Sequence, residues 1–170
     1  MRFTLIDRIT ELQPGTKITA IKSLSASEEY LRDHFPRFPV MPGVLMLEAM
    51  YEASAWLIRS SENYQHAVIL LKEARNVKYA DFVEPGETLV VTSTIVKQDP
   101  SLTTVKAQGT VGQVLAVSGT LILHRFHVAD VHPKRAAWDA YARKKYREQF
   151  ASLYRPDTHP EDTELANTVA

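Results

Sequence analysis

The segment from residue 42 to residue 60 limits the fold most strongly, because it is predicted to be a helix with apolar residues on nearly all sides. Pro42 suits the first helical position, where a missing N–H would have no partner in any case. The apolar residues behind it cover most of the helix circumference: Leu45, Met46, Leu47, Ala49, Met50, Ala53, Trp56 and Leu57. A helix this hydrophobic must be wrapped by other structure. No apolar run approaches the roughly 20 residues of a membrane helix, so we expect no membrane span.

Long β-strands are expected to supply that wrapping. Turn sequences such as 84–87 and 99–101 separate four β-rich runs, at 67–79, 87–97, 102–111 and 113–126. A further run, 16–24, alternates like a strand. Tight connections join antiparallel strands, whereas parallel strands need long crossovers. We therefore predict an α+β domain, in which a curled antiparallel sheet surrounds a long central helix.

The composition changes after residue 130. Residues 134–150 are predicted to form a second helix, with five residues spaced for one buried face: Trp138, Tyr141, Ala142, Tyr146 and Phe150. Residues 151–170 are predicted to be a frayed tail. The expected organisation is one domain over residues 1–130, followed by a helical extension and tail over 131–170.

Charge and composition exclude several classes of protein. Twenty basic and twenty acidic residues cancel, so whole-chain charge predicts neither nucleic-acid nor membrane binding. Cysteine is absent, which excludes disulfides, thiolate nucleophiles and zinc-cysteine sites. The first residues meet charge too early for a secretory signal, so we expect a cytoplasmic protein.

Three residue types near the start of the helix suggest proton chemistry beside a carbonyl group. His34 lies in a proline-stiffened loop, Gly43 allows a ligand to approach backbone N–H groups, and Glu48 lies in an otherwise apolar helix. The residues alone leave a simpler interpretation open. A loop histidine is usually solvated, and Glu48, Glu52 and Arg59 fit an ordinary polar helix face.

Three blocks of sequence resemble the FabZ/FabA family of 3-hydroxyacyl-(acyl-carrier-protein) dehydratases. They are residues 5–9, residues 34–50 and residues 76–87, in the order and spacing of that family over roughly residues 1–126. The family has the hot-dog fold, a long helix wrapped by an antiparallel sheet, which agrees with the pattern above. The resemblance implies dehydration of (3R)-3-hydroxyacyl thioesters to trans-2-enoyl thioesters, with no cofactor and no metal.

The resemblance also assigns expected roles to individual residues. His34 matches the catalytic histidine of the family and Glu48 its catalytic acid, and a glutamate at this position is typical of FabZ rather than FabA. Gly43, followed by Val44, matches the glycine whose N–H receives the thioester oxygen. In this family the histidine and the acid of one site come from different subunits, so we expect a homodimer or a larger homo-oligomer.

Two positions depart from the family pattern. Arg37 stands where glycine is usual, which would alter the loop if that glycine needed a positive φ. Glu52 stands where glutamine is common, and a second carboxylate one helical turn from Glu48 would raise one of the two pKa values. Two alternatives to a dehydratase remain: an acyl thioesterase with the same fold, and a non-catalytic acyl-binding module.

The second helix carries a basic cluster that suggests a partner. The cluster comprises Arg143, Lys144, Lys145 and Arg147. It is either a solvated helix face or a docking site for the acidic acyl carrier protein. A chain without net charge needs such a local basic surface to attract an acidic partner. Nucleic acid is a poorer interpretation, because the aromatic residues of this helix are expected to be buried. His124, His127 and His132 lack convincing metal-ligand spacing, so no metal site is predicted.

Overall fold

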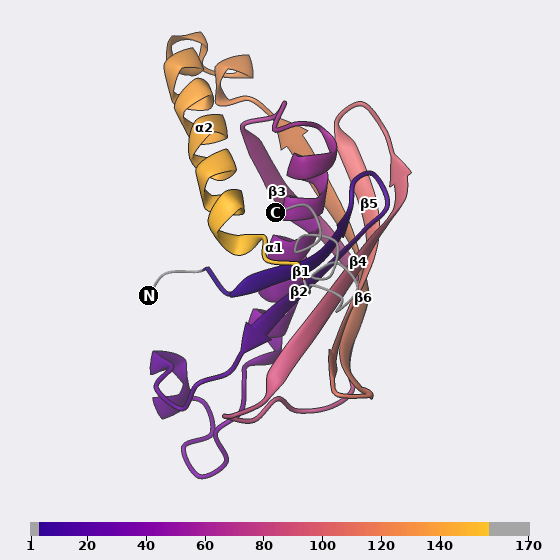
Figure 1. Cartoon of the computed structure of the whole chain (residues 1–170), viewed down its shortest axis with the longest axis vertical. Coiled ribbons are helices and arrows are strands. Elements are labelled where there is room, and N and C mark those ends of the chain that lie inside the picture. The colour runs from indigo at the N-terminus through magenta and orange to yellow at the C-terminus, as the bar shows by residue number, and fades with distance from the viewer. Residues whose placement is uncertain (1–3, 157–170) are drawn as a thin grey trace, which may run out of the picture.

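The computed structural model describes residues 4–156, which form one antiparallel six-stranded sheet and two long helices (Figure 1). The strands lie in the order β1-β2-β4-β5-β6-β3. Their bounds are β1 Arg8–Gln13, β2 Lys17–Ser23, β3 Val68–Tyr79, β4 Thr88–Gln98, β5 Leu102–Val111 and β6 Val114–Phe126. The helices are α1 Gly43–Ser61 and α2 Ala136–Leu153, with short 3₁₀ turns η1 Glu29–Arg32, η2 Val128–Asp130 and η3 Pro133–Arg135.

Helix α1 is the centre of the hydrophobic core, as its composition predicts. It contacts all six strands, and Ala49, Met50, Ala53 and Leu57 are completely buried. The strands turn alternate residues toward it, as Leu89 and Val91 of β4 illustrate. The predicted α+β arrangement of a long helix against an antiparallel sheet is therefore confirmed.

The first strand is the element that the sequence pattern did not predict. In β1 the pairing with β2 shifts register between Ile9 and Glu11, and this irregularity interrupts the two-residue alternation that marks a strand. The predicted run 16–24 becomes β2, and the other four β-rich runs become β3 to β6. All five strands begin and end within one residue of their expected bounds.

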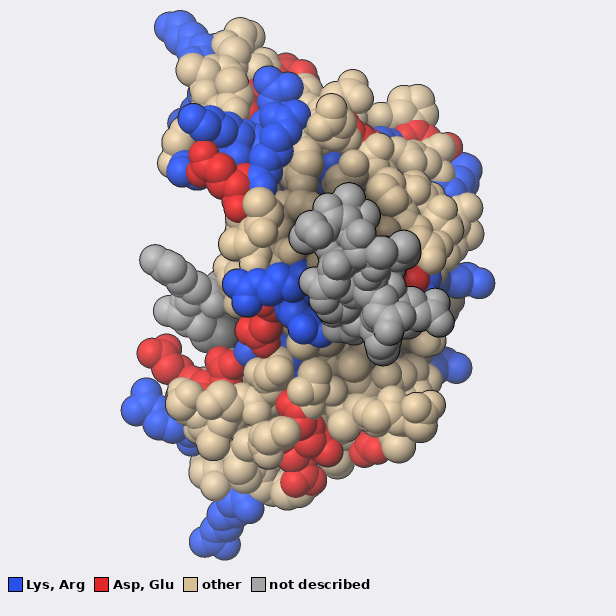
Figure 2. Space-filling view, viewed as in Figure 1, with Lys and Arg blue, Asp and Glu red and all other residues tan. Residues whose placement is uncertain are grey.

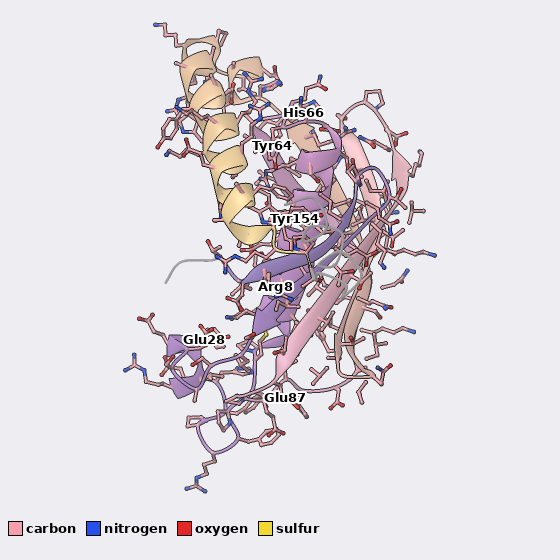
Figure 3. The ribbon with its side chains drawn as sticks, viewed as in Figure 1. Arg8, Glu28, Tyr64, His66, Glu87 and Tyr154 are labelled. Atoms are coloured by element: carbon pink, nitrogen blue, oxygen red, sulfur yellow. The ribbon has the colours of Figure 1, made fainter. Side chains whose placement is uncertain are left out.

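The two edges of the sheet differ. The outer edge of β1 meets the residues that follow α2: Tyr154 forms a parallel bridge with Ile9, and the Arg155 N–H donates to the Ile9 carbonyl at 3.0 Å. Tyr154 is labelled beside β1 in Figure 3. The other edge is β3, whose outer side pairs with no strand of residues 4–156.

The prediction of a single buried aromatic stripe on the second helix is wrong in its first half. Trp138 and Tyr141 are 45% and 58% exposed. The reason is Asp139, which accepts backbone N–H bonds from Val128 and Ala129 at 2.9 Å and so fixes which side of α2 faces inward. Residues 139, 142, 146, 150 and 153 then share that side at helical spacing.

The predicted tail begins later than residue 151. Helix α2 continues to Leu153, which is buried, and Tyr154 pairs with β1. The rest of the predicted tail, residues 157–170, lies outside the described residues.

Candidate active site

The loop that carries His34 is held at both ends by backbone hydrogen bonds. The His34 N–H donates to the Tyr30 carbonyl at 3.1 Å, and the Met41 N–H donates to the Val83 carbonyl at 2.9 Å. Phe35 adopts a left-handed conformation with φ of 49°, and Arg37 is not among the residues with positive φ. The chain therefore makes its left-handed turn at Phe35, so arginine at position 37 is compatible with the loop.

His34 lines an apolar cavity of about 350 Å³ together with the first residue of α1. The other lining residues are Phe35, Val40, Met41, Gly43, Met46, Tyr79, Ala80, Asp81 and Phe82. A Cβ atom on Gly43 would lie 3.0 Å from two ring carbons of Tyr79, so only glycine fits there without a shift. The first backbone N–H groups of a helix have no partner within it, so those of Gly43 and Val44 are available to a ligand oxygen.

Glu48 lies on the opposite side of α1, in a second cavity of about 230 Å³. Its position, two residues after Met46, corresponds to a rotation of about 200° around a helix. This cavity is lined by Thr4, Glu48, Tyr51, Glu52, Ala55, Trp56, Arg59, Tyr146 and Gln149. Burial raises the pKa of the Glu48 carboxyl, which favours the protonated form that a general acid requires.

Glu52, the second departure from the family pattern, binds the N-terminal segment. Its carboxylate accepts backbone N–H bonds from Leu5 and Ile6 at 2.9–3.1 Å. Burial raises the pKa of Glu52 and the nearby Glu48 raises it further, whereas these two N–H groups and Arg59 lower it. The two glutamates thus line one cavity, and the charge of Glu48 contributes to the raised pKa of Glu52.

A single chain therefore does not bring His34 and Glu48 together. Each lines its own cavity, and α1 separates the two. Three neighbours of these cavities were not predicted, because they depend on tertiary contacts: Tyr79 beside Gly43, and the pair Arg59 and Tyr146 near Glu52. Arg59 was named from the sequence only as part of an ordinary polar helix face with Glu48 and Glu52.

The basic cluster of α2 is only partly available to a partner. Lys145 pairs with Glu148 at 2.6 Å, and Arg147 donates to the Asn63 carbonyl at 2.8 Å and lies over the Tyr64 ring. Lys144 is exposed, and Arg143 is half-buried. Figure 2 shows acidic side chains among the basic ones where α2 lies, at the upper left.

Within residues 4–156, no three His, Asp or Glu side chains are grouped in a way that would hold a metal ion. Two of the histidines considered above have aromatic neighbours: the rings of His124 and Phe126 stack at 5.0 Å, and those of His127 and His66 at 5.4 Å. Neither α1 nor α2 is long and apolar enough to cross a membrane.

Comparison with known proteins connects this geometry to one family. The sequence profile of the FabA-like domain matches residues 1–120. The 3-hydroxyacyl-[acyl-carrier-protein] dehydratase FabZ of Levilactobacillus brevis is 39% identical over 116 residues, covering 68% of this chain and 78% of that protein. FabZ of Lactococcus lactis subsp. cremoris is 38% identical over 119 residues, covering 70% and 82%, and FabZ of Clostridium kluyveri is 35% identical over 120 residues, covering 71% and 83%.

Solved structures support the same assignment at the level of the fold. The dehydratase heterocomplex ApeI:P from Xenorhabdus doucetiae matches with a TM-score of 0.63 at 16% identity, covering 79% of this chain and 90% of that one. The conserved protein PA5202 from Pseudomonas aeruginosa matches with a TM-score of 0.58 at 17% identity, covering 70% and 87%. The predicted hot-dog fold is confirmed. With residues 1–120 matched and identities of 35–39% to FabZ enzymes, the chain belongs to the FabA-like family.

Proposed function

We propose that the protein dehydrates 3-hydroxyacyl groups carried by acyl carrier protein, and that its substrates are (3R)-3-hydroxyacyl thioesters. The observation that carries this proposal is the apolar cavity in which His34 lies with Gly43, at the N-terminus of α1. The FabZ relatives, which carry dehydratase names, support the same reaction. The product is a trans-2-enoyl thioester and water, and no cofactor or metal is required.

The chemistry divides between the two cavities. In this proposal His34 removes the C2 proton, while the N–H groups of Gly43 and Val44 and the positive end of α1 stabilise the negative charge on the thioester oxygen. Glu48 donates its proton to the C3 hydroxyl, which leaves as water as the C2–C3 double bond forms. Proton transfer from the histidine back to the glutamate, through solvent, completes the cycle.

One active site then needs two copies of the chain, His34 from one and Glu48 from the other. Two features support a dimer. The outer edge of β3 is unpaired within residues 4–156, and such an edge readily pairs with another strand. Large apolar side chains are exposed at or near the His34 cavity, including Phe35, Val44 and Phe82. We also propose acyl carrier protein as the partner and the cytoplasm as the location.

The test is to incubate the full-length protein with 3-hydroxyacyl-(acyl carrier protein) over a series of chain lengths. Formation of the enoyl product supports the proposal. Release of free carrier thiol would instead identify a thioesterase, and binding without any product would identify an acyl-binding module. Glu48→Gln is the matched inactive control, since the amide keeps the shape of the side chain but is not an acid.

A further inference from the structure

Helix α2 lies outside the family match, which ends at residue 120, yet it is packed firmly against the domain. The rings of Tyr146 and Phe150 lie 6.0 and 6.1 Å from the ring of Trp56 on α1. Phe150 also meets Tyr64, and Tyr64 is labelled between α1 and α2 in Figure 3. The contacts on both α1 and β1 indicate a fixed position for this helix.

The main polar feature beneath α2 is a buried cation. Arg59 is only 8% exposed, and its guanidinium carbon lies 4.1 Å from the centre of the Tyr146 ring and 5.3 Å from that of Trp56. Burial lowers the pKa of Arg59, but arginine remains charged in proteins near neutral pH. Cation–π contacts of this kind gain strength when the cation is desolvated.

Arg59 shares its cavity with the candidate acid Glu48 and with Glu52. The titratable and charged groups that line it are Glu48, Tyr51, Glu52 and Arg59 from α1 and Tyr146 from α2, and Gln149 of α2 completes that wall. Tyr64 lies near both arginines: Arg147 lies over its ring, and burial raises its pKa while the charges of Arg147 and Arg59 lower it. Burial is the leading cause of the raised pKa of both Glu48 and Glu52, and α2 supplies part of the wall of the cavity in which both lie.

We propose that α2 is a positioning part of the active site: Tyr146 holds the Arg59 cation and keeps water out of the cavity, and together they set the protonation of the Glu48–Glu52 pair. The inference rests on the proposed function, in which Glu48 is the acid. Neither Arg59 nor Tyr146 touches substrate in this proposal; both act through the two carboxyl groups.

Two substitutions should shift the titration of the pair in opposite directions. Arg59→Met removes the cation while keeping apolar bulk, so ionising the carboxyls becomes harder and their apparent pKa values rise. Tyr146→Ala admits water beside the carboxyls while Arg59 still lies over the Trp56 ring, so the pKa values fall toward the ordinary range. A general loss of packing would not shift the carboxyl pKa values in opposite directions in two variants whose altered residues are in contact.

The experiment follows the carboxyl carbons of the ¹³C-glutamate-labelled, full-length protein by NMR through a pH titration, with Glu48→Gln and Glu52→Gln assigning the signals. The pH profile of kcat is measured in parallel, and its alkaline limb reports loss of the acid's proton. We expect shifts of about half a pH unit or more, upward for Arg59→Met and downward for Tyr146→Ala. Tyr146→Phe, which keeps the ring, should behave as the wild type.

Tyr141→Ala is the matched control, because Tyr141 is exposed on the same helix. The role of α2 would be overturned if Tyr141→Ala shifted the carboxyl pKa values as much as Tyr146→Ala does. It would also be overturned if Arg59→Met and Tyr146→Ala shifted them in the same direction. If Tyr146→Ala does not fold, a comparison of Arg59→Met with Arg59→Lys decides the question. Arg59→Lys keeps the charge, so only Arg59→Met should raise the pKa values of the carboxyls. A wild type that shows no dehydration would instead defeat the proposed function. The NMR titration needs no turnover, so it tests the role of α2 separately.

Discussion

The two cavities on either side of α1 differ in composition and in origin. The His34 cavity is mostly apolar and is built entirely from residues within the family match. The Glu48 cavity holds two carboxyl groups and a guanidinium group, and residues 146 and 149 of its wall lie beyond that match. Both cavities are therefore built mainly on the family domain, and the Glu48 cavity differs in receiving part of its wall from a helix beyond the family match.

The largest expected effect tests whether both cavities serve one reaction. His34→Ala and Glu48→Gln should each lower kcat by about 10² or more, as loss of a positioned acid or base does. Steady-state dehydration assays check this, with circular dichroism to confirm folding. The exposed residues His132 and Glu29 provide the controls, since His132→Ala and Glu29→Gln should leave kcat unchanged. A wild-type rate in either site variant would remove that cavity from the mechanism.

A second experiment asks whether the cavities meet across two subunits. Random exchange between His34→Ala and Glu48→Gln should restore about one quarter of wild-type activity, because half of the dimers are mixed and each mixed dimer has one intact site. The measurement is activity after subunit exchange, with each variant incubated alone as control. If the mixture remains as inactive as its parents although light scattering and mass spectrometry show exchange, one chain must supply both residues.

The close contact between Gly43 and Tyr79 offers a smaller and more specific effect. Gly43→Ala should reduce kcat/KM about tenfold, because a methyl group would crowd the N–H groups that receive the thioester oxygen. Tyr79 is half exposed and has room to move, so the melting temperature should change little. In the double variant Gly43→Ala/Tyr79→Ala the ring contact is gone. Activity that stays low there supports the oxyanion role, and recovered activity would show that Gly43 matters only for packing.

The smallest expected effect concerns carrier-protein docking by α2. Lys144→Gln should raise KM for the carrier-bound substrate about twofold, while turnover of a small thioester analogue remains unchanged, since exposed charges act mainly on encounter. Lys145→Gln is the matched control, because Lys145 already pairs with Glu148. Added salt should reduce the difference between Lys144→Gln and the wild type. An equal response from both substrates would make this helix a solvated face, and Arg32, Arg37 and Lys72 would be tested next.

Local pattern predicted most of the fold. The apolar residues of α1 and the β-rich runs give the ends of this helix and of five strands, β2 to β6, to within one residue, because periodicity and turns are local properties. Strand β1 was missed because its register shift near Ile9 breaks the alternation. The buried face of α2 was wrong in its first half because Asp139 fixes the rotation of the helix through backbone groups of η2. Such a choice between helix faces is made by tertiary contact.

The candidate site divides in the same way. His34, Gly43 and Glu48 were recognised through sequence motifs, which the family match covers. The cation–π contact between Arg59 and Tyr146 joins residues far apart in the chain, and no motif connects them. Sequence motifs therefore supplied the candidate reacting groups, whose roles stay a prediction, while their electrostatic surroundings required the structure.

The unequal edges of the sheet bear on how far assembly can proceed. Within residues 4–156, β3 is an open edge, while residues 154 and 155 partly cover β1. When two copies join β3 to β3, the joined sheet has only its two β1 edges left, and both are obstructed. Under this proposed pairing we expect growth by strand addition to stop at two copies, so that the contacts of residues 154 and 155 with β1 would separate a finite dimer from an open fibre.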